Sequence, residues 1–257
     1  MRGLLCEADC DGEPVTPPWD DPRIFRGLAI QLARRRERLA AGEKALGWKV
    51  AFGAPAALER LRIAAPLVGF LTQKSLLASG TTLPVAGWTN PVVEPEIAVH
   101  LSKDVPAGAD RELAAAAIGG LGPAIEVVDS DSPPTAETLQ DTLASDIFHR
   151  NVILGKNDVS RAGCVLQGLV AHVLKNGIEL APPAAPAATA IDLIDIVRHV
   201  AGTLGAFGEL LCAGHIIITG SLVTPLPIRA GDQFFFDLRP IDGISVKLSA
   251  DVSPIRT

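Results

Sequence analysis

The stretch that most constrains this fold is an apolar run, residues 92–99, which carries two carboxylates one residue apart. Side chains alternate between the two faces of a strand, so Glu94 and Glu96 point to one face while the apolar residues around them point to the other. Two like charges about 5 Å apart repel each other by roughly 3 kcal/mol at an effective dielectric constant of about 20. A strand with this sequence therefore needs water or a cation beside its acidic face.

A second apolar run, residues 123–129, carries a further carboxylate, Glu126, in a setting typical of a buried strand. Three ionised carboxylates share a dry site only if they are protonated or bind a cation. Oxygen ligands without Cys or His nearby favour Mg²⁺ or Mn²⁺. The pattern predicts either a metal site of Glu94, Glu96 and Glu126 or an edge strand, which Pro95 permits, with its acids in water. The spacing alone does not choose between them.

A third feature is a lone lysine in residues 46–52, which alternate as a strand. Lys49 shares its face with Gly47 and Ala51, whose small side chains leave room for a ligand beside the ammonium group. A solvated lysine on a surface strand would show the same residues. Without other information the solvated lysine is the favoured interpretation.

Composition sets the class of protein. The chain has 257 residues, of which 48% are hydrophobic, and this provides ample core material. Its net charge is -6. We expect one domain, with a helical lead-in and strand over residues 1–80 packed on a catalytic core of residues 81–257. No long apolar run or signal peptide is evident, so we expect a cytoplasmic protein with no membrane segment. The acidic balance and the absence of Tyr make nucleic acid an unlikely partner.

The periodicity predicts helices at residues 21–42, 55–63, 110–118, 135–146 and 192–207. It predicts strands at 46–52, 81–85, 92–99, 123–129, 151–154, 165–173, 178–180, 216–218, 233–238 and 244–248. Gly119 and Gly120 are expected to end a helix, and Asn176-Gly177 and Asp242-Gly243 to form hairpin turns. Residues 1–20 and 181–188 are expected to be irregular, with Cys6 and Cys10 as free thiols. This inventory predicts an α+β fold with a mixed, mostly antiparallel sheet that rolls on itself.

Several segments, in order along the chain, carry a resemblance to a known family. The chain resembles the fumarylacetoacetate hydrolase superfamily, and within it the 2-hydroxypenta-2,4-dienoate (2-keto-4-pentenoate) hydratases and 4-oxalocrotonate decarboxylases. The matching segments are residues 47–50, 91–98, 123–130, 211–222 and 230–232. Their combination is specific, although each motif alone would be weak.

The resemblance implies a β-roll core with flanking helices, a Mg²⁺ or Mn²⁺ ion held by Glu94, Glu96 and Glu126, and a homo-oligomer. It also implies that Lys49 reaches the substrate or a catalytic water. The turn of Gly220 and Ser221 would then contact the substrate carboxylate. His149, beside Arg150, either holds an anionic end of the substrate or belongs to a strand edge outside the site.

The implied activity is that of a hydratase that adds water to a 2-hydroxy-2,4-dienoate through a metal-bound enolate, in the catabolism of aromatic-derived 2-oxo acids. The same metal site would serve a 2-oxo acid decarboxylase or a C–C bond hydrolase. A non-catalytic, metal-stabilised partner subunit is an alternative of another class. The chain departs from similar hydratases at Leu67, at Val223 and over residues 145–150, where substrate identity would be decided.

Overall fold

The computed structural model of the chain describes residues 17–180 and 192–251. Several helices begin at an aspartate whose carboxylate accepts a backbone N–H of the first turn, as Asp21, Asp110 and Asp192 do. The helices are α1 (Pro22–Ala40), α2 (Pro55–Leu61), α3 (Arg111–Ala117), α4 (Leu139–Ala144) and α5 (Leu193–Ala206), with short 3-10 helices η1 (Pro18–Asp20), η2 (Gln73–Ser75) and η3 (Val159–Arg161).

The strands form two sheets. The first has the order β2 (Leu67–Thr72), β1 (Ala45–Ala51), β10 (Ile216–Ile218), β5 (Pro91–Leu101), β6 (Ile118–Asp129), β7 (His149–Leu154) and β3 (Leu76–Leu77), and β11 (Leu226–Pro227) pairs with β5. The second has the order β4 (Thr82–Pro84), β13 (Asp242–Ser249), β12 (Gln233–Arg239), β8 (Val170–Lys175) and β9 (Ile178–Glu179). The pairs β1–β10, β3–β7 and β4–β13 are parallel and the other pairings are antiparallel. The predicted α+β fold with a curled, mostly antiparallel sheet is confirmed.

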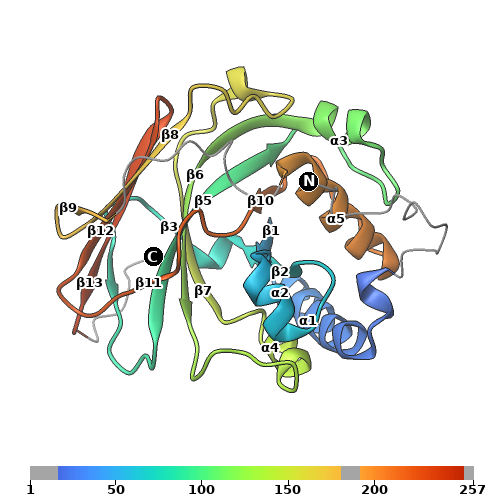
Figure 1. Cartoon of the computed structure of the whole chain (residues 1–257), viewed down its shortest axis with the longest axis horizontal. Helices are drawn as coiled ribbons and strands as arrows, with labels where there is room; N and C mark the ends of the chain where they lie inside the picture. Colours follow the sequence, from blue (N-terminus) through green and yellow to red (C-terminus); the bar gives the residue numbers. More distant parts are fainter. Residues whose placement is uncertain (1–16, 181–191, 252–257) are drawn as a thin grey trace.

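The main core lies between the two sheets. In Figure 1 the second sheet stands on the left, the long strands β5 and β6 curve through the centre, and α1, α2, α4 and α5 lie on the right. Apolar side chains from one face of β5 and β6 pack with others from β12 and α5, among them Val93, Ile97, Ile125, Phe234, Phe236 and Val200. Burial of these side chains supplies the main favourable free energy of folding.

The opposite face of the first sheet carries the acidic residues. Strands β5 and β6 pair over their whole length, and the register places Glu94 directly opposite Glu126 and Glu96 opposite Ala124. A smaller apolar cluster, which includes Ala98, Ala124 and Val152, continues this face beyond the carboxylates. Because side chains alternate along β5 and β6, one face of this sheet is apolar throughout, whereas the other face is apolar at one end and carries the glutamates at the other.

Gly119 and Gly120 correct one prediction, because they do not end a helix but lie within β6. Helix α3 ends at Ala117, and the strand begins at the next residue. Close packing explains these glycines: a Cβ on Gly120 would lie 2.1 Å from Oδ1 of Asn157. Glycine within a strand thus marks a close approach of a second chain segment.

The helix predicted over residues 135–146 is also shorter than expected. Helix α4 covers Leu139–Ala144, and Asp146, Ile147 and Phe148 then adopt left-handed backbone angles, which end the helix. Strand β7 begins at His149, two residues before the predicted start.

The two predicted hairpins exist, with changes at their ends. Asn176 and Gly177 form the turn between β8 and β9, with φ angles of 56° and 78°. However, β8 begins at Val170, since residues 165–169 form turns. The turn between β12 and β13 lies at residues 240–241, because Asp242 already pairs with Leu238 and is not in the turn.

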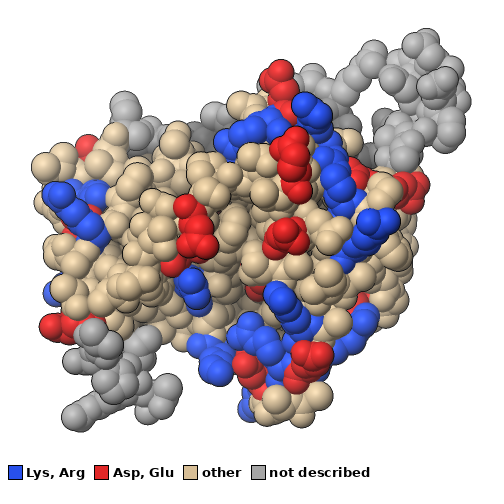
Figure 2. All heavy atoms as spheres, turned by 90° about the horizontal axis from the view of Figure 1, so that it is seen from below, with Lys and Arg blue, Asp and Glu red and all other residues tan. Residues whose placement is uncertain are grey.

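No helix within residues 17–180 and 192–251 is long and apolar enough to cross a membrane. The expectations for residues 1–16, with Cys6 and Cys10, and for the loop at 181–188 lie outside the described residues. The division at residue 80 stays a prediction; β1 and β2, which precede it, belong to the same sheet as β5 and β6. Seen from below, acidic and basic side chains are interspersed around broad uncharged areas (Figure 2).

Candidate active site

Three glutamates meet on the polar end of the first sheet. Glu94 and Glu96 come from β5 and Glu126 from the paired strand β6, and one carboxylate oxygen of each lies within 4.8 Å of the others. Glu96 and Glu126 are almost fully buried, at 0% and 1% exposure. The predicted alternative, in which the acids of this strand lie in water, is therefore wrong for Glu96.

Burial and mutual repulsion determine the charge of this cluster. Burial raises the pKa of the Glu94 carboxyl to about 7, and repulsion from Glu126 adds to the effect. Burial, with repulsion from Glu126 and Glu94, raises the pKa of Glu96 well above its usual range. Burial would also raise the pKa of Glu126, but Lys49 and His149 outweigh it, and this pKa is lowered. Without a cation, the cluster thus holds its charge mainly on Glu126.

The carboxylates keep oxygens that no group in the described part of the chain satisfies. Glu96 accepts the N–H of Gly220 at 2.7 Å through Oε2, whereas its buried Oε1 has no hydrogen-bond partner among the described residues. Glu126 uses Oε1 for its protein contacts, and Glu94 accepts no hydrogen bond within the described part of the chain. A buried oxygen without a partner is costly, and a cation would remove that cost. Carboxylate oxygens suit a hard divalent ion, so the cluster fits a divalent cation of this kind.

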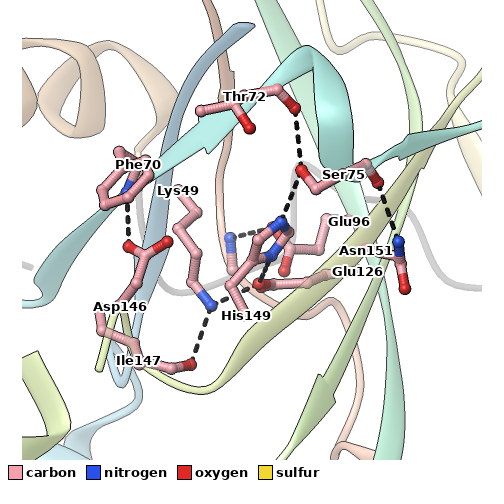
Figure 3. Close-up of polar contacts among 11 residues, drawn as sticks. Lys49, Phe70, Thr72, Ser75, Glu96, Glu126, Asp146, Ile147, His149 and Asn151 are labelled. Carbon is pink, nitrogen blue, oxygen red and sulfur yellow. Dashed lines mark hydrogen bonds and ion pairs between the residues drawn. The ribbon is translucent and has the colours of Figure 1, made fainter. Parts of the chain in front are cut away.

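Lys49 enters the same site from β1. Its face of the strand is the face that carries the glutamates, and its side chain is 1% exposed, so the solvated interpretation of Lys49 is wrong. The ammonium group donates to Glu126 Oε1 and, over 3.2 Å, to the carbonyl of Ile147 (Figure 3). Burial disfavours the ammonium, but the Glu126 carboxylate outweighs it, and the pKa of Lys49 is raised.

His149 also lies in the site, against the third glutamate. Its Nδ1 is 2.7 Å from Glu126 Oε1, and its Nε2 is 2.9 Å from the hydroxyl of Ser75 on η2. Burial lowers the pKa of His149, although Glu126 acts in the opposite direction. An ionised carboxylate can only accept hydrogen bonds, so Nδ1–H donates to Glu126. Both ring nitrogens thus have protein partners. The neighbouring Arg150 points outward instead and pairs with Asp129 at 3.2 Å.

Asp146 is a site residue that the sequence did not reveal. Figure 3 shows its carboxylate beside the Lys49 side chain, where Oδ1 accepts the N–H of Phe70 at 2.8 Å. Burial raises the pKa of Asp146 to about 7, against the opposing influence of Lys49 and the Phe70 N–H. The signal in the sequence was its position within residues 145–150, the segment that departs from similar hydratases.

The remaining predicted residues lie at the edge of the cluster. Gly220 has a left-handed φ of 92°, which lets its N–H turn toward Glu96. The hydroxyl of Ser221 is buried and has no hydrogen-bond partner among the described residues. Leu67, one of the departures from similar hydratases, is buried in an apolar cluster with Leu28 and Leu143, and contributes to packing.

Comparison with known sequences finds a matching family model and relatives that are named as dienoate hydratases. A protein-family model, fumarylacetoacetate (FAA) hydrolase C-terminal, matches residues 48–246. A 2-hydroxyhexa-2,4-dienoate hydratase from Comamonas testosteroni is 31% identical over 224 residues, which cover 86% of this chain and 84% of the relative. A 2-hydroxypent-2,4-dienoate hydratase from Pseudomonas putida is 32% identical over 197 residues, or 76% of this chain and 88% of the relative.

Comparison with solved structures gives the same fold. The structure of 4-oxalocrotonate decarboxylase from Pseudomonas putida G7, complexed with magnesium and adipate, superposes with a TM-score of 0.79. It is 23% identical in sequence, and the match covers 91% of this chain and 90% of that chain. At this identity the similarity establishes the shared fold.

Proposed function

The chain belongs to the fumarylacetoacetate hydrolase family, and we propose that it is a divalent-metal-dependent hydratase that adds water to a 2-hydroxy-2,4-dienoate. We place this reaction in the catabolism of aromatic-derived 2-oxo acids. The observation that carries the proposal is the buried cluster of three glutamates with the Lys49 ammonium beside it. The two relatives named as dienoate hydratases, at 31% and 32% identity, support the reaction class.

We assign Glu94, Glu96 and Glu126 as the ligands of a Mg²⁺ or Mn²⁺ ion. The unsatisfied oxygen of Glu96 supports this assignment, as does magnesium in the solved decarboxylase of the same fold. A divalent ion there would act as a Lewis acid on the oxygens of a 2-oxo acid. The Gly220 N–H holds the Glu96 carboxylate in place, and His149 does the same for Glu126.

The chain's own residues would bind the substrate and move protons. Hydration requires that the 2-hydroxyl of the dienol loses its proton while C5 gains one, and that water then adds its OH at C4 and its other proton at C3, so that one water molecule is added in total. We assign proton transfer to the Lys49 ammonium, because positioned acid–base groups contribute about 10² to 10⁴ in rate. The unpaired hydroxyl of Ser221 is assigned to the substrate carboxylate. We also propose that the chain assembles as a homo-oligomer.

The direct test is turnover by the purified protein. With Mg²⁺, 2-hydroxypenta-2,4-dienoate should lose its ultraviolet absorbance and give the hydrated 4-hydroxy-2-oxo acid, whereas protein treated with a chelator should be inactive. Release of CO₂ from a 2-oxo acid instead would indicate the decarboxylase alternative. If metal-loaded protein consumes no oxo acid of this class, the enzyme proposal fails, and a non-catalytic subunit becomes the better interpretation.

The metal assignment has a separate test. Glu94→Gln should abolish Mn²⁺ binding, measured by electron paramagnetic resonance, while the circular dichroism spectrum stays that of the wild type. Glu112→Gln on α3 is the matched control, because Glu112 is exposed and lies outside the cluster. Tight Mn²⁺ binding by Glu94→Gln would contradict the assignment.

A further inference from the structure

The buried Lys49 ammonium relies for its counter-ion on Glu126, a carboxylate that is also a proposed metal ligand. The ammonium group donates to Glu126, which the proposed function assigns to a divalent cation. A carboxylate that binds a dication shares its charge with the metal and neutralises a neighbouring ammonium less. Binding of a cation would therefore leave Lys49, buried and positively charged, beside additional positive charge. Such an arrangement requires a second counter-ion.

Asp146 lies where this counter-ion is needed. A Cβ built on Gly69 would be 2.8 Å from Cγ of Lys49 and 2.9 Å from Oδ1 of Asp146, so both side chains cross the strand β2 at this glycine. The carboxylate of Asp146 is held by the N–H of Phe70 through Oδ1. Its second oxygen, Oδ2, has no hydrogen-bond partner within residues 17–180 and 192–251. The Lys49 ammonium has three donors and uses two of them, on Glu126 and Ile147.

The backbone that presents Asp146 is strained. Asp146, Ile147 and Phe148 have φ angles of 61°, 52° and 62°, all in the left-handed region. Each such residue other than glycine costs on the order of 1 kcal/mol or more, and a β-branched residue such as Ile147 is especially unfavourable there. The run brings the Ile147 carbonyl to Lys49 and the Asp146 carboxylate to Phe70. Strain of this kind persists at functional sites, where surrounding contacts maintain it.

We propose that Asp146 is the alternative counter-ion of Lys49, and that Lys49 moves from Glu126 to Asp146 when a divalent cation binds the glutamates. The inference rests on the proposed metal site. Asp146 then acts as a positioning residue: it keeps the ammonium charged and beside the substrate, and it frees Glu126 for the metal. The Ile147 carbonyl is the contact that Lys49 keeps in both arrangements.

A double-mutant cycle on metal affinity tests the exchange without substrate. Mn²⁺ dissociation constants are measured for the wild type, Asp146→Asn, Lys49→Met and the double variant. Asparagine keeps an acceptor for the Phe70 N–H and removes only the charge. Asp146→Asn should weaken Mn²⁺ binding tenfold or more when Lys49 is present and by about twofold or less in the Lys49→Met background. Asp141→Asn, an exposed aspartate of α4, is the control and should have no effect.

The outcomes separate this inference from the proposed function. An equal effect of Asp146→Asn in both backgrounds, or no effect, overturns the exchange while the metal site stands. Absence of Glu94-dependent Mn²⁺ binding in the wild type overturns the metal site and this inference with it. If Asp146→Asn does not fold, a crystal structure of the Mg²⁺-loaded wild type decides. Lys49 Nζ within hydrogen-bond distance of Asp146 supports the exchange, and Nζ still on Glu126 overturns it.

Discussion

The Lys49 side chain crosses a dry part of the protein and ends between a carboxylate and a carbonyl. Gly69 on the paired strand leaves the space through which it runs, because a Cβ there would lie 2.8 Å from Cγ of Lys49. Gly47 serves another contact, since a Cβ there would lie 2.0 Å from the carbonyl oxygen of Ile216. A buried ammonium without acceptors would lose its proton. Glu126 and Ile147 prevent this, so Lys49 remains a cation that can donate a proton beside the glutamates.

Replacement of this lysine should separate catalysis from metal binding. Lys49→Met keeps much of the side-chain volume and removes the proton donor, so kcat should fall by about 10² or more. Mn²⁺ affinity should be retained or rise, since the ammonium no longer competes for Glu126. Steady-state rates and Mn²⁺ titration measure the two effects, with the exposed Lys44→Met as control. Undiminished turnover by Lys49→Met would remove Lys49 from the mechanism.

At the level of elements, the site combines regular and irregular parts. The pair β5–β6 places the three glutamates by register alone, because facing residues of an antiparallel pair share a face. The irregular part is the left-handed run after α4, which brings Asp146 and His149 to the same place. Alternation predicts the first part, whereas packing of α4 and β2 maintains the second.

The hairpin β8–β9 provides a stability prediction away from the site. Asn176 adopts a left-handed conformation, donates to Asp232 at 2.9 Å and accepts the N–H of Gln233 at 2.8 Å. Asn176→Ala should reduce the free energy of unfolding by about 1–3 kcal/mol, because alanine disfavours this conformation and makes neither bond. Asn176→Gly, which restores only the backbone freedom, should lose less. Urea unfolding measures both, and a wild-type value for Asn176→Ala would contradict this account.

At the scale of the whole molecule, the carboxylate cluster makes folding stability depend on pH and on metal. The pKa of Glu94 and that of Asp146 are both raised to about 7 in the folded chain, above the ordinary values of about 4 for the unfolded chain. Between these values the folded chain holds more protons than the unfolded one, so a rise in pH favours unfolding. The contribution of these two groups to stability should thus be complete below about pH 4, and it should be lost as pH rises to about 7.

Thermal unfolding measures this dependence. In the presence of a chelator, ionisation of these two groups should lower the Tm of the protein by roughly 5 °C between pH 5 and pH 8. Saturating Mg²⁺ should reduce the fall, since a bound cation stabilises the ionised carboxylates. Glu94→Gln should have a shallower decline than the wild type in chelator. Superimposable curves for these two proteins would show that Glu94 has no raised pKa.

The sequence by itself determined the strand alternation, and with it the face that Glu94 and Glu96 share, because a side-chain period of two is a local property of the backbone. It also determined the helix starts at aspartates and the turn at Asn176-Gly177. The resemblance to a known family chose among the alternatives that the residues left open.

Only the tertiary structure decided which groups surround those residues. The register of β5 against β6 brought Glu126 opposite Glu94, and the docking of residues 146–149 on β2 brought Asp146 and His149 to Lys49. Residues 145–149 are far along the chain from Lys49, and no local pattern encodes their left-handed turn. Burial likewise depends on what the rest of the chain places over a residue, so the charge of each carboxylate was fixed by the fold.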